Sequence, residues 1–370
     1  MKFTNSHGVT IGFTPWFDNG YRFTYLHLYE ELGGKIAYGE MAMEFVGKDE
    51  ALKLLTDQHT GELTIETDQS DTPKYTIPVF IVDISHDKNF ANIKFICVGD
   101  KNFGISQRTS TWDDIEKAVK GLYPGKVDIR CETDIQAKDI KYYQNDETDQ
   151  EFLSRLCYSF KKNCVFTFGW EGFMMKETMG KYDSRGNIEP KLQIHGDSDF
   201  TQVSTYSKPY DPSLYTPPID IWSNTEEPIV AIKDYTEVKP VNPQVLYKYG
   251  SMSIIHSKYY QLEENWTYNT TYLNSSMFQE ITITHHVIPK FKIGDALYYM
   301  RDNLRFPESA KLPYKYYLVR SNEFFIALDG SQLSAPDGSD MLWTTRLLGL
   351  EENGSIALGK TEDPTDTTEE

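Results

Sequence analysis

The stretch Gln144-Asn-Asp-Glu-Thr-Asp-Gln-Glu-Phe-Leu-Ser-Arg-Leu-Cys157 decides the fold, and it continues as Tyr158-Ser-Phe-Lys-Lys-Asn-Cys-Val-Phe-Thr-Phe168. Thr148 and Glu151 have the spacing of a capping box, in which a hydroxyl and a carboxylate bond amides that the first helical turn leaves free. Apolar side chains follow at helical spacing and fall on one face: Phe152, Leu153, Leu156, Cys157 and Phe160. The pattern predicts an amphipathic helix over residues 149–161.

A strand and a hairpin are predicted directly after this helix. Phe166 and Phe168 alternate with smaller residues, and the Trp170-Glu-Gly172 segment has the composition of a turn. Arg155 lies beside the apolar face of the helix. It is interpreted either as a solvated surface cation or as one half of an ion pair that orients this unit or contacts another subunit.

Short segments with period-two alternation flank this region, and each is typical of a strand with one buried face. In the first hundred residues, Tyr21, Phe23, Tyr25 and His27 are expected on one aromatic face. A helix over 111–122, with Thr111 and Asp114 at its start, is predicted before position 144. The other expected strands are 35–45, 62–67, 75–84, 92–98, 126–130, 279–288 and 296–300, with a closing pair, 316–320 and 323–328, around Ser321 and Asn322.

Composition favours a β-rich protein of several domains. The chain has 370 residues, of which 39% are apolar and 14% aromatic, with 25 Tyr and 20 Phe. This content is typical of strands, and the length exceeds what one core usually serves. The net charge of −18 disfavours a nucleic-acid binder, because phosphate contacts require surplus cations. Met1–Thr10 lacks a basic patch followed by an apolar run, so neither a secretion signal nor a membrane segment is expected.

No catalytic, cofactor or metal site is predicted. The four cysteines lack the paired short spacing of zinc sites and are interpreted as reduced, buried thiols. His285 and His286 are adjacent in a predicted strand, so they point to opposite faces and do not share one ion. Asp146, Glu147 and Asp149 are interpreted as helix-capping residues, with paired carboxylates for glycoside hydrolysis as the weaker alternative.

Taken together, residues 105–170 resemble the phage late-control, baseplate-hub and type VI spike-hub family. The matching motifs are a helix before a strand, the Tyr143-Gln144 lead-in, the polar cap Glu147-Thr-Asp149, the helix Phe152-Leu-Ser-Arg-Leu156 and the aromatic strand Val165–Phe168. The family usually has a glycine between that helix and strand, where this chain has Lys162 and Asn163. Asn tolerates the left-handed conformation that such an exit needs, so the departure is mild.

The resemblance implies a mainly β (α+β) fold with four parts. These are a tube-like β-barrel over 1–135, an inserted α+β domain over 136–216, a second barrel over 217–345 with a connecting segment, and a tail over 346–370, whose acidic composition with hardly any apolar bulk predicts disorder. It also implies a structural, non-enzymatic hub of the tail baseplate, whose three copies join a sixfold tail tube to a threefold spike. The implied partners are the spike, the tail tube and neighbouring baseplate proteins, with DNA passing through the lumen without specific binding. The implied location is the virion, after assembly in the host cytoplasm.

Two other functions stay open from the residues themselves. Six Trp and 25 Tyr could stack on sugar faces in a carbohydrate- or receptor-binding tail module. A tail-associated hydrolase would need two convergent carboxylates in a cleft.

Overall fold

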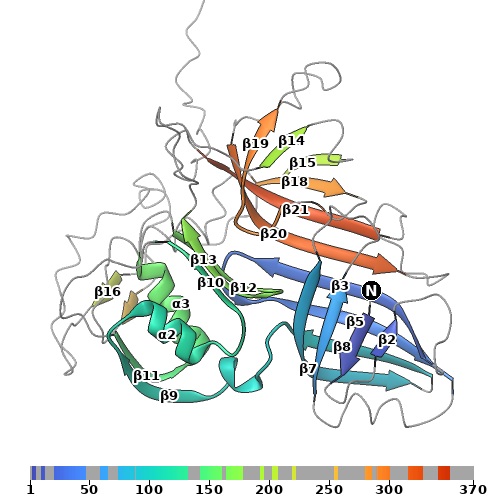
Figure 1. The fold of residues 1–370 in the computed structure, drawn as a ribbon, viewed down its shortest axis with the longest axis horizontal. Coiled ribbons are helices and arrows are strands. Elements are labelled where there is room, and N and C mark those ends of the chain that lie inside the picture. The colour runs from blue at the N-terminus through green and yellow to red at the C-terminus, as the bar shows by residue number, and fades with distance from the viewer. Residues whose placement is uncertain are drawn as a thin grey trace, which may run out of the picture.

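The computed structural model describes residues 2–5, 10–12, 21–46, 59–65, 74–87, 89–131, 142–160, 164–177, 192–195, 202–206, 219–221, 254–256, 280–285, 289, 291–300, 316–327 and 341–350. The mainly β class is confirmed, because strands dominate this part of the chain (Figure 1). The helices described are α2 (Ile115–Leu122), α3 (Asp149–Phe160) and the short 3-10 helix η1 (Lys101–Gly104).

The strands before α3 are β1 (Lys2–Asn5), β2 (Thr10–Gly12), β3 (Tyr21–Glu31), β4 (Gly33–Ile36), β5 (Tyr38–Phe45), β6 (Thr60–Ile65), β7 (Tyr75–Asp87), β8 (Phe90–Ile96), β9 (Gln107–Trp112), β10 (Val127–Arg130) and β11 (Tyr142–Thr148). Those after it are β12 (Cys164–Gly169), β13 (Gly172–Glu177), β14 (Leu192–His195), β15 (Gln202–Tyr206), β16 (Ile219–Ile221), β17 (Ile254–His256), β18 (Glu280–His285), β19 (Ala296–Met300), β20 (Tyr316–Ala327) and β21 (Met341–Leu350).

One curled sheet runs through both ends of the chain. Its path is β15-β18-β21-β20-β3-β5-β8-β7-β6-β1-β2, and β19 and β14 extend it from β20, so that 13 described strands belong to it. The seam between the N-terminal and C-terminal strands is the antiparallel pairing of β3 with β20, from Ser321 opposite Glu31 to Ala327 opposite Tyr25. Strands of both expected barrels therefore share one hydrogen-bonded sheet. The division at residues 135, 216 and 345 stays a prediction, and β21 itself continues to Leu350.

The buried face of β3 changes phase at a β-bulge between Phe23 and Tyr25. Phe23 is buried before the bulge, whereas Leu26 and Leu28 are buried after it. The extra residue moves Tyr25 and His27 to the partly exposed face, because a shift of one residue sends each side chain to the other side of a sheet. The single aromatic face expected for Tyr21 to His27 is therefore wrong.

The expected hairpin around Ser321 and Asn322 is also wrong, because residues 316–327 form the single strand β20. A bulge between Val319 and Ser321 takes up the irregularity. Ser321 is 3% exposed and Asn322 is fully buried, so these turn-type residues lie in the middle of the sheet.

The second unit combines a four-stranded sheet, ordered β10-β13-β12-β4, with the helices and the β9–β11 ribbon (Figure 1). The predicted hairpin is present, since β12 and β13 pair up to Gly169 opposite Gly172. Gly172 has a φ of +135°, and a Cβ there would lie 2.3 Å from the carbonyl oxygen of Lys126, so the turn needs glycine. α2 begins later than expected: Asp114 caps it by accepting from Lys117 N at 2.8 Å, and Thr111 lies in β9.

Three hydrophobic clusters hold these parts together. The first fills the N-terminal half of the sheet and includes Trp170 and Trp343 from outside that half. The second joins α2 and α3 to β12 and β13, with Phe103 of η1 among its members. The third packs Leu32 and Val165 against Leu318 and Leu348 of the C-terminal strands. The second unit is thus packed against both halves of the sheet.

Candidate functional site

The capping box at the start of α3 has reciprocal hydrogen bonds. Glu151 N donates to Thr148 Oγ1 at 3.2 Å, and Glu151 Oε2 accepts from both the backbone N and the hydroxyl of Thr148 at 2.9 Å. Phe152, Leu153 and Leu156 are fully buried on the face that the spacing predicts. The side chain of Phe160 and residue 161 lie outside the described part of the chain.

Arg155 forms a two-point ion pair with Glu147. Its Nε and one terminal nitrogen lie 2.9 and 2.6 Å from the two carboxylate oxygens, and the side chains are only 15% and 25% exposed. The guanidinium also lies 5.3 Å from the ring centre of Phe152. Of the two interpretations of Arg155, the ion pair is the one observed, and it connects α3 to the end of β11 within one unit.

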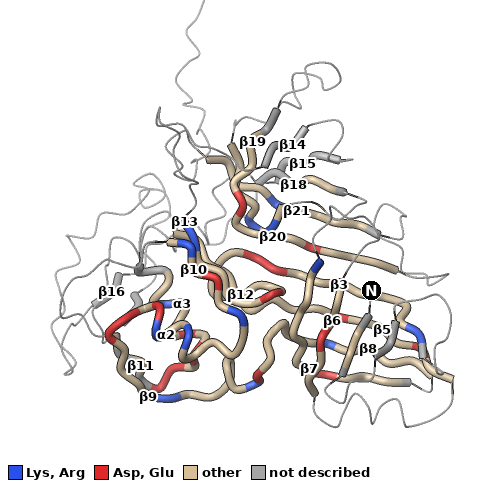
Figure 2. Tube along the Cα trace, viewed as in Figure 1, with Lys and Arg blue, Asp and Glu red and all other residues tan. Residues whose placement is uncertain are grey.

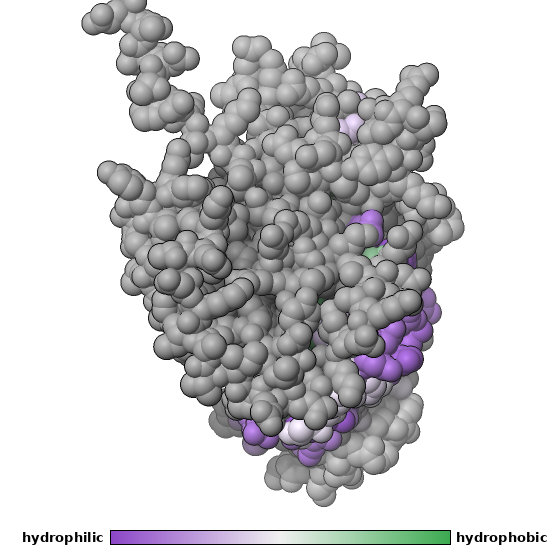
Figure 3. Space-filling view, turned by 90° about the vertical axis from the view of Figure 1, so that its left-hand side faces the viewer, coloured by the Kyte–Doolittle hydropathy of each residue, from purple (hydrophilic) through white to green (hydrophobic). Residues whose placement is uncertain are grey.

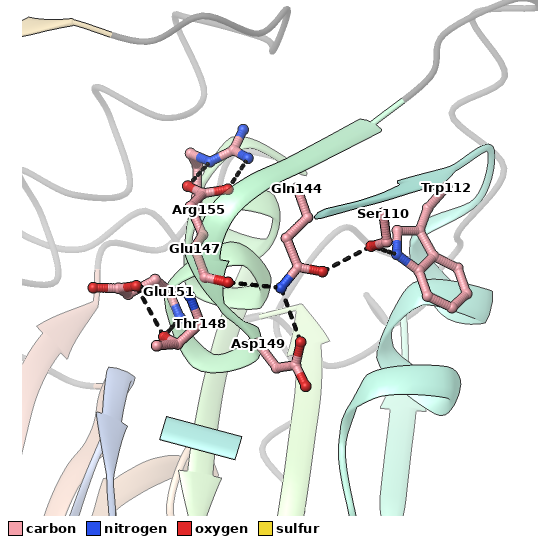
Figure 4. Close-up of polar contacts among 8 residues, drawn as sticks. All are labelled: Ser110, Trp112, Gln144, Glu147, Thr148, Asp149, Glu151 and Arg155. Atoms are coloured by element: carbon pink, nitrogen blue, oxygen red, sulfur yellow. Dashed lines mark hydrogen bonds and ion pairs between the residues drawn. The ribbon is translucent and has the colours of Figure 1, made fainter. Parts of the chain in front are cut away.

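A buried amide, Gln144, links α3 to the β9–β11 ribbon (Figure 4). Its Nε2 donates to Asp149 Oδ1 at 2.8 Å and to the carbonyl of Glu147 at 3.1 Å, while its Oε1 accepts from Ser110 Oγ at 2.7 Å. Ser110 Oγ accepts in turn from Trp112 Nε1 at 2.7 Å. Such a connected polar network inside a core fixes one arrangement, because any other leaves buried groups unpaired.

A β-bulge in β11 brings the side chains of Gln144 and Glu147 into position for these bonds. The register shifts between Gln144 and Glu147, and Asp146 adopts a φ of +54°, a left-handed conformation that Asp tolerates. Glu147 is thereby paired with Arg155, and the Gln144 amide reaches Asp149. The sequence gives one cue for this, the polar Tyr-Gln lead-in, but no cue that the amide is buried.

The three carboxylates weighed for hydrolysis do not converge, and two of them have separate partners. Asp149 is 1% exposed and binds Arg108 and Gln144, Glu147 binds Arg155, and Asp146 is exposed. None of the three lines the cavity around Glu30 and Lys126. The geometry is that of a helix terminus bound to a ribbon.

That cavity, of about 130 Å³, lies where the second unit meets both halves of the sheet. Charges of both signs gather there, around β3, β10, β12 and β13 (Figure 2). The charged residues that line it are Glu30, Lys126, Asp128, Arg130, Glu171, Lys176, Lys292 and Asp295. Three ion pairs neutralise most of them: Lys176 with Asp295 at 2.7 Å, Arg130 with Asp128 at 2.6 Å, and Lys292 with Glu171.

Glu30 is the buried acid of this junction, with only 4% of its surface exposed. It accepts hydrogen bonds from Asn322 Nδ2 of β20 and from the backbone N of Trp170, each at 3.0 Å. Burial raises the pKa of its carboxyl to about 7, against the opposing effect of these two donors. Burial likewise lowers the pKa of Lys176, which Asp295 partly offsets.

Three large aromatic side chains meet beside Glu30, each from a different part of the fold. Tyr75, Trp170 and Trp343 have ring centres 5.4 to 5.9 Å apart. Lys292 Nζ lies 5.0 Å from the ring centre of Tyr75. Because Trp170 and Trp343 are at most 1% exposed, they serve packing and are closed to a sugar at the surface.

The cysteines and the surface point to no further chemistry in the described residues. Cys97, Cys157 and Cys164 are buried, and burial raises the pKa of the first two thiols well above the usual value. Among the described residues, no group of His, Cys, Asp and Glu could hold a metal ion, and no helix is long and apolar enough to cross a membrane. On the side shown in Figure 3, the described surface residues are mostly hydrophilic.

Solved structures identify the architecture. No protein-family model and no curated protein matches the sequence. The 43 kDa tail protein of prophage MuSo2 from Shewanella oneidensis matches over 96% of this chain and 98% of its own, with a TM-score of 0.50 and 10% identity. The tail protein from Neisseria meningitidis MC58 matches over 96% of both chains, with a TM-score of 0.51 and 9% identity. The chain has the fold of phage tail proteins.

The tail-protein fold accounts for nearly the whole chain, since the two matches extend well beyond the motifs of residues 105–170. A third structure, the E. coli c3393 protein, is a component of the type VI secretion system; it matches over 91% of this chain and 76% of its own, with a TM-score of 0.49 and 12% identity. In this tail-protein fold, the Gln144 network and the Glu30 junction are two places where buried polar groups connect separate elements.

Proposed function

We propose that the chain is a structural hub subunit of a phage tail baseplate, and that three copies form a ring between a sixfold tail tube and a threefold spike. The observation that carries this proposal is the continuous sheet, in which one chain supplies both an N-terminal and a C-terminal set of strands. Three such chains would present six curved sets of strands around one axis. A threefold assembly would then match a sixfold neighbour by duplication within each chain.

The two faces of the sheet support a position in the wall of such a ring. One face carries the apolar core, with Leu26, Leu28 and Met41 among its members. The other carries polar pairs across neighbouring strands: two ion pairs, Arg22 with Glu44 and Lys94 with Glu40, and the hydrogen-bonded pair of His27 and Glu323. A wall with one packed and one hydrated face fits a tube around a water-filled lumen.

The charge of the hydrated face fits a passage that DNA does not bind. Arg22 and Lys94 each face a carboxylate, so these pairs add no surplus of cations, and the whole chain carries −18. Phosphate binding needs such a surplus. The proposal includes contacts with the spike, the tail tube and neighbouring baseplate proteins, no enzymatic role, and a place in the virion after assembly in the host cytoplasm.

Analytical ultracentrifugation tests the assembly. We expect three times the mass of one chain, either for the protein alone or when the spike chain is added. A strict monomer under both conditions would contradict the ring, whereas the fold would be untouched by that result.

A second measurement tests the lumen. We expect the assembled protein to leave a fluorescent DNA duplex free at low ionic strength, where phosphate contacts are strongest. Retention of the duplex that weakens steeply with added salt would contradict a passage without binding.

A further inference from the structure

Three buried polar side chains cross the seam of the sheet in a row. Asn322 of β20 lies directly opposite Glu30 of β3 on one side and opposite Thr345 of β21 on the other. Asn322 and Thr345 are fully buried. The row therefore connects the N-terminal half of the sheet to the two main strands of the C-terminal half.

The hydrogen bonds along this row have one direction. Thr345 Oγ1 donates to Asn322 Oδ1 at 3.1 Å, and Asn322 Nδ2 donates to Glu30 Oε1 at 3.0 Å. The other carboxylate oxygen, Oε2, accepts from Trp170 N. In this arrangement both oxygens of Glu30 act as acceptors, which is the pattern of an ionised carboxylate.

The same row satisfies a protonated Glu30 if the amide turns over. A proton on Oε1 makes that atom a donor, and the amide oxygen of Asn322 can accept from it once the amide has rotated by half a turn. Asn322 Nδ2 then donates to a lone pair of Thr345 Oγ1, whose hydroxyl hydrogen rotates away from the amide. Oε2 keeps its bond from Trp170 N, so the contact with the second unit is unchanged in both arrangements.

We propose that Glu30, Asn322 and Thr345 form a proton-binding switch within the seam, in which uptake of one proton by Glu30 reverses the hydrogen bonds of the row. The proton comes from water through the cavity that Glu30 lines, since a volume of about 130 Å³ is enough to admit water. The charge of the junction changes by one as a result.

The surroundings of Glu30 allow this change near neutral pH. Within the described residues, no Lys or Arg forms an ion pair with Glu30, and the pKa of the carboxyl is raised to about 7 chiefly by burial. Charged and titratable groups surround it on several elements. They are Glu171 in the turn between β12 and β13, Lys292 and Asp295 before β19, Tyr75 on β7, Cys97 after β8, Lys176 on β13, and Lys126, Asp128 and Arg130 at β10. Glu171 raises the pKa of Glu30 and Lys292 lowers it, so these two effects have opposite directions.

Nuclear magnetic resonance on the full chain tests the switch. Glutamate labelled with carbon-13 at the carboxyl reports on Glu30, whose signal is the one that Glu30→Gln removes. Asparagine labelled with nitrogen-15 reports on the Asn322 amide. We expect the two signals to shift with the same midpoint, near pH 7. A Glu30 signal that titrates near the ordinary value of 4.5, or an Asn322 amide that does not follow it, would overturn the proposal.

Two substitutions strengthen the test. Glu30→Gln places an NH2 where the protonated oxygen would be, so its Asn322 amide signal should match the low-pH wild type at every pH. Glu323→Gln is the matched control, because Glu323 pairs with His27 on the opposite face of β20, and the Glu30 titration should persist there. An Asn322 signal in Glu30→Gln that resembles the high-pH wild type would contradict the turning of the amide.

Asn322→Leu separates a turning amide from a fixed one. A fixed amide donates a hydrogen bond only to the ionised carboxylate. Its removal should therefore destabilise the ionised form of Glu30 and raise the midpoint of the Glu30 titration by about one pH unit or more. A turning amide bonds both forms, so its removal should change the proton affinity of Glu30 by less than about threefold. The larger shift would overturn the switch, provided that the variant keeps the wild-type spectrum elsewhere.

Discussion

Lys176 of β13 and Asp295 in the turn before β19 form an ion pair of 2.7 Å across the boundary between the second unit and the C-terminal strands. The side chains are 15% and 27% exposed, and Asp295 Oδ2 also accepts from the backbone N of Lys292 at 2.7 Å. Gly294, beside them, approaches so closely that a Cβ would lie 2.8 Å from Met174 Cε. The turn is thus held against β13 by the ion pair of Lys176 with Asp295 and by close packing of Gly294 on Met174.

Removing the cation of this pair should destabilise the protein. We expect Lys176→Met to lower the free energy of unfolding by about 1–3 kcal/mol, because it leaves a largely buried carboxylate without its partner. Urea denaturation measures the change. Lys120→Met is the control: its pair with Glu116 is exposed on α2 and should cost less than about 0.5 kcal/mol. Equal losses in the two variants would contradict a buried role for Lys176.

The stability of the junction should depend on pH through Glu30. Its pKa is raised from 4.5 to about 7 in the folded protein, so the folded state binds more protons than the unfolded state between these values. The free energy of unfolding should therefore fall as the pH rises through this window. Since one pH unit corresponds to about 1.4 kcal/mol, the loss amounts to roughly 3 kcal/mol. Glu30→Gln should remove this dependence in urea titrations at pH 5 and 8, and an unchanged slope would refute the assignment.

The Gln144 network should be sensitive to loss of its amide. Gln144→Leu leaves Asp149 Oδ1, the Glu147 carbonyl and the Ser110 hydroxyl without the bonds they now make, and we expect a loss of about 3 kcal/mol or more. Ser106→Ala removes an exposed hydrogen bond to Asn102 and should change the stability by less than about 0.5 kcal/mol. A Gln144→Leu variant as stable as wild type would mean that the network does not order α3.

The packing of α3 gives a further test. Leu156 is fully buried in the cluster that joins α3 to β12 and β13, so Leu156→Ala should cost roughly 2–5 kcal/mol through lost contacts and a cavity. Lys117→Ala, on the exposed face of α2, should stay within about 0.5 kcal/mol of wild type. Thermal or urea unfolding compares the two, and a loss below about 1 kcal/mol for Leu156→Ala would contradict the buried position.

Local patterns in the sequence predict α3 and the hairpin of β12 and β13 after it, but not the strand β11 before it. The capping box and the spacing of Phe152, Leu153 and Leu156 depend on neighbours within two turns, and the structure has them where expected. The β-bulges, in contrast, are not predicted by the spacing of neighbouring residues. One extra residue after Phe23 exchanges the faces of β3, and another after Val319 lets β20 continue through Ser321 and Asn322. Neither bulge leaves a mark in the alternation of apolar residues.

The two polar clusters were beyond prediction for a related reason. Gln144 and Glu30 are ordinary surface residue types, and their burial depends on partners brought close by tertiary structure: Ser110 for the first, Asn322 and Trp170 for the second. Glu30 and Asn322 are 292 positions apart, so no local pattern connects them. What composition and motif do indicate is the mainly β class, and the nearly full-length matches with two tail proteins extend that to the fold.

The pairing of β3 with β20 also has a consequence for the order in which the chain can fold during synthesis. Residues 21–31 leave the ribosome well before their partner strand, residues 316–327, has been made. At usual rates of translation, the edge of β3 waits on the order of tens of seconds for its neighbour. An unpaired strand edge is a template for association with other chains. Newly made protein is therefore most vulnerable to aggregation before β20 emerges, and the pairing of β20 with β3 ends that exposure.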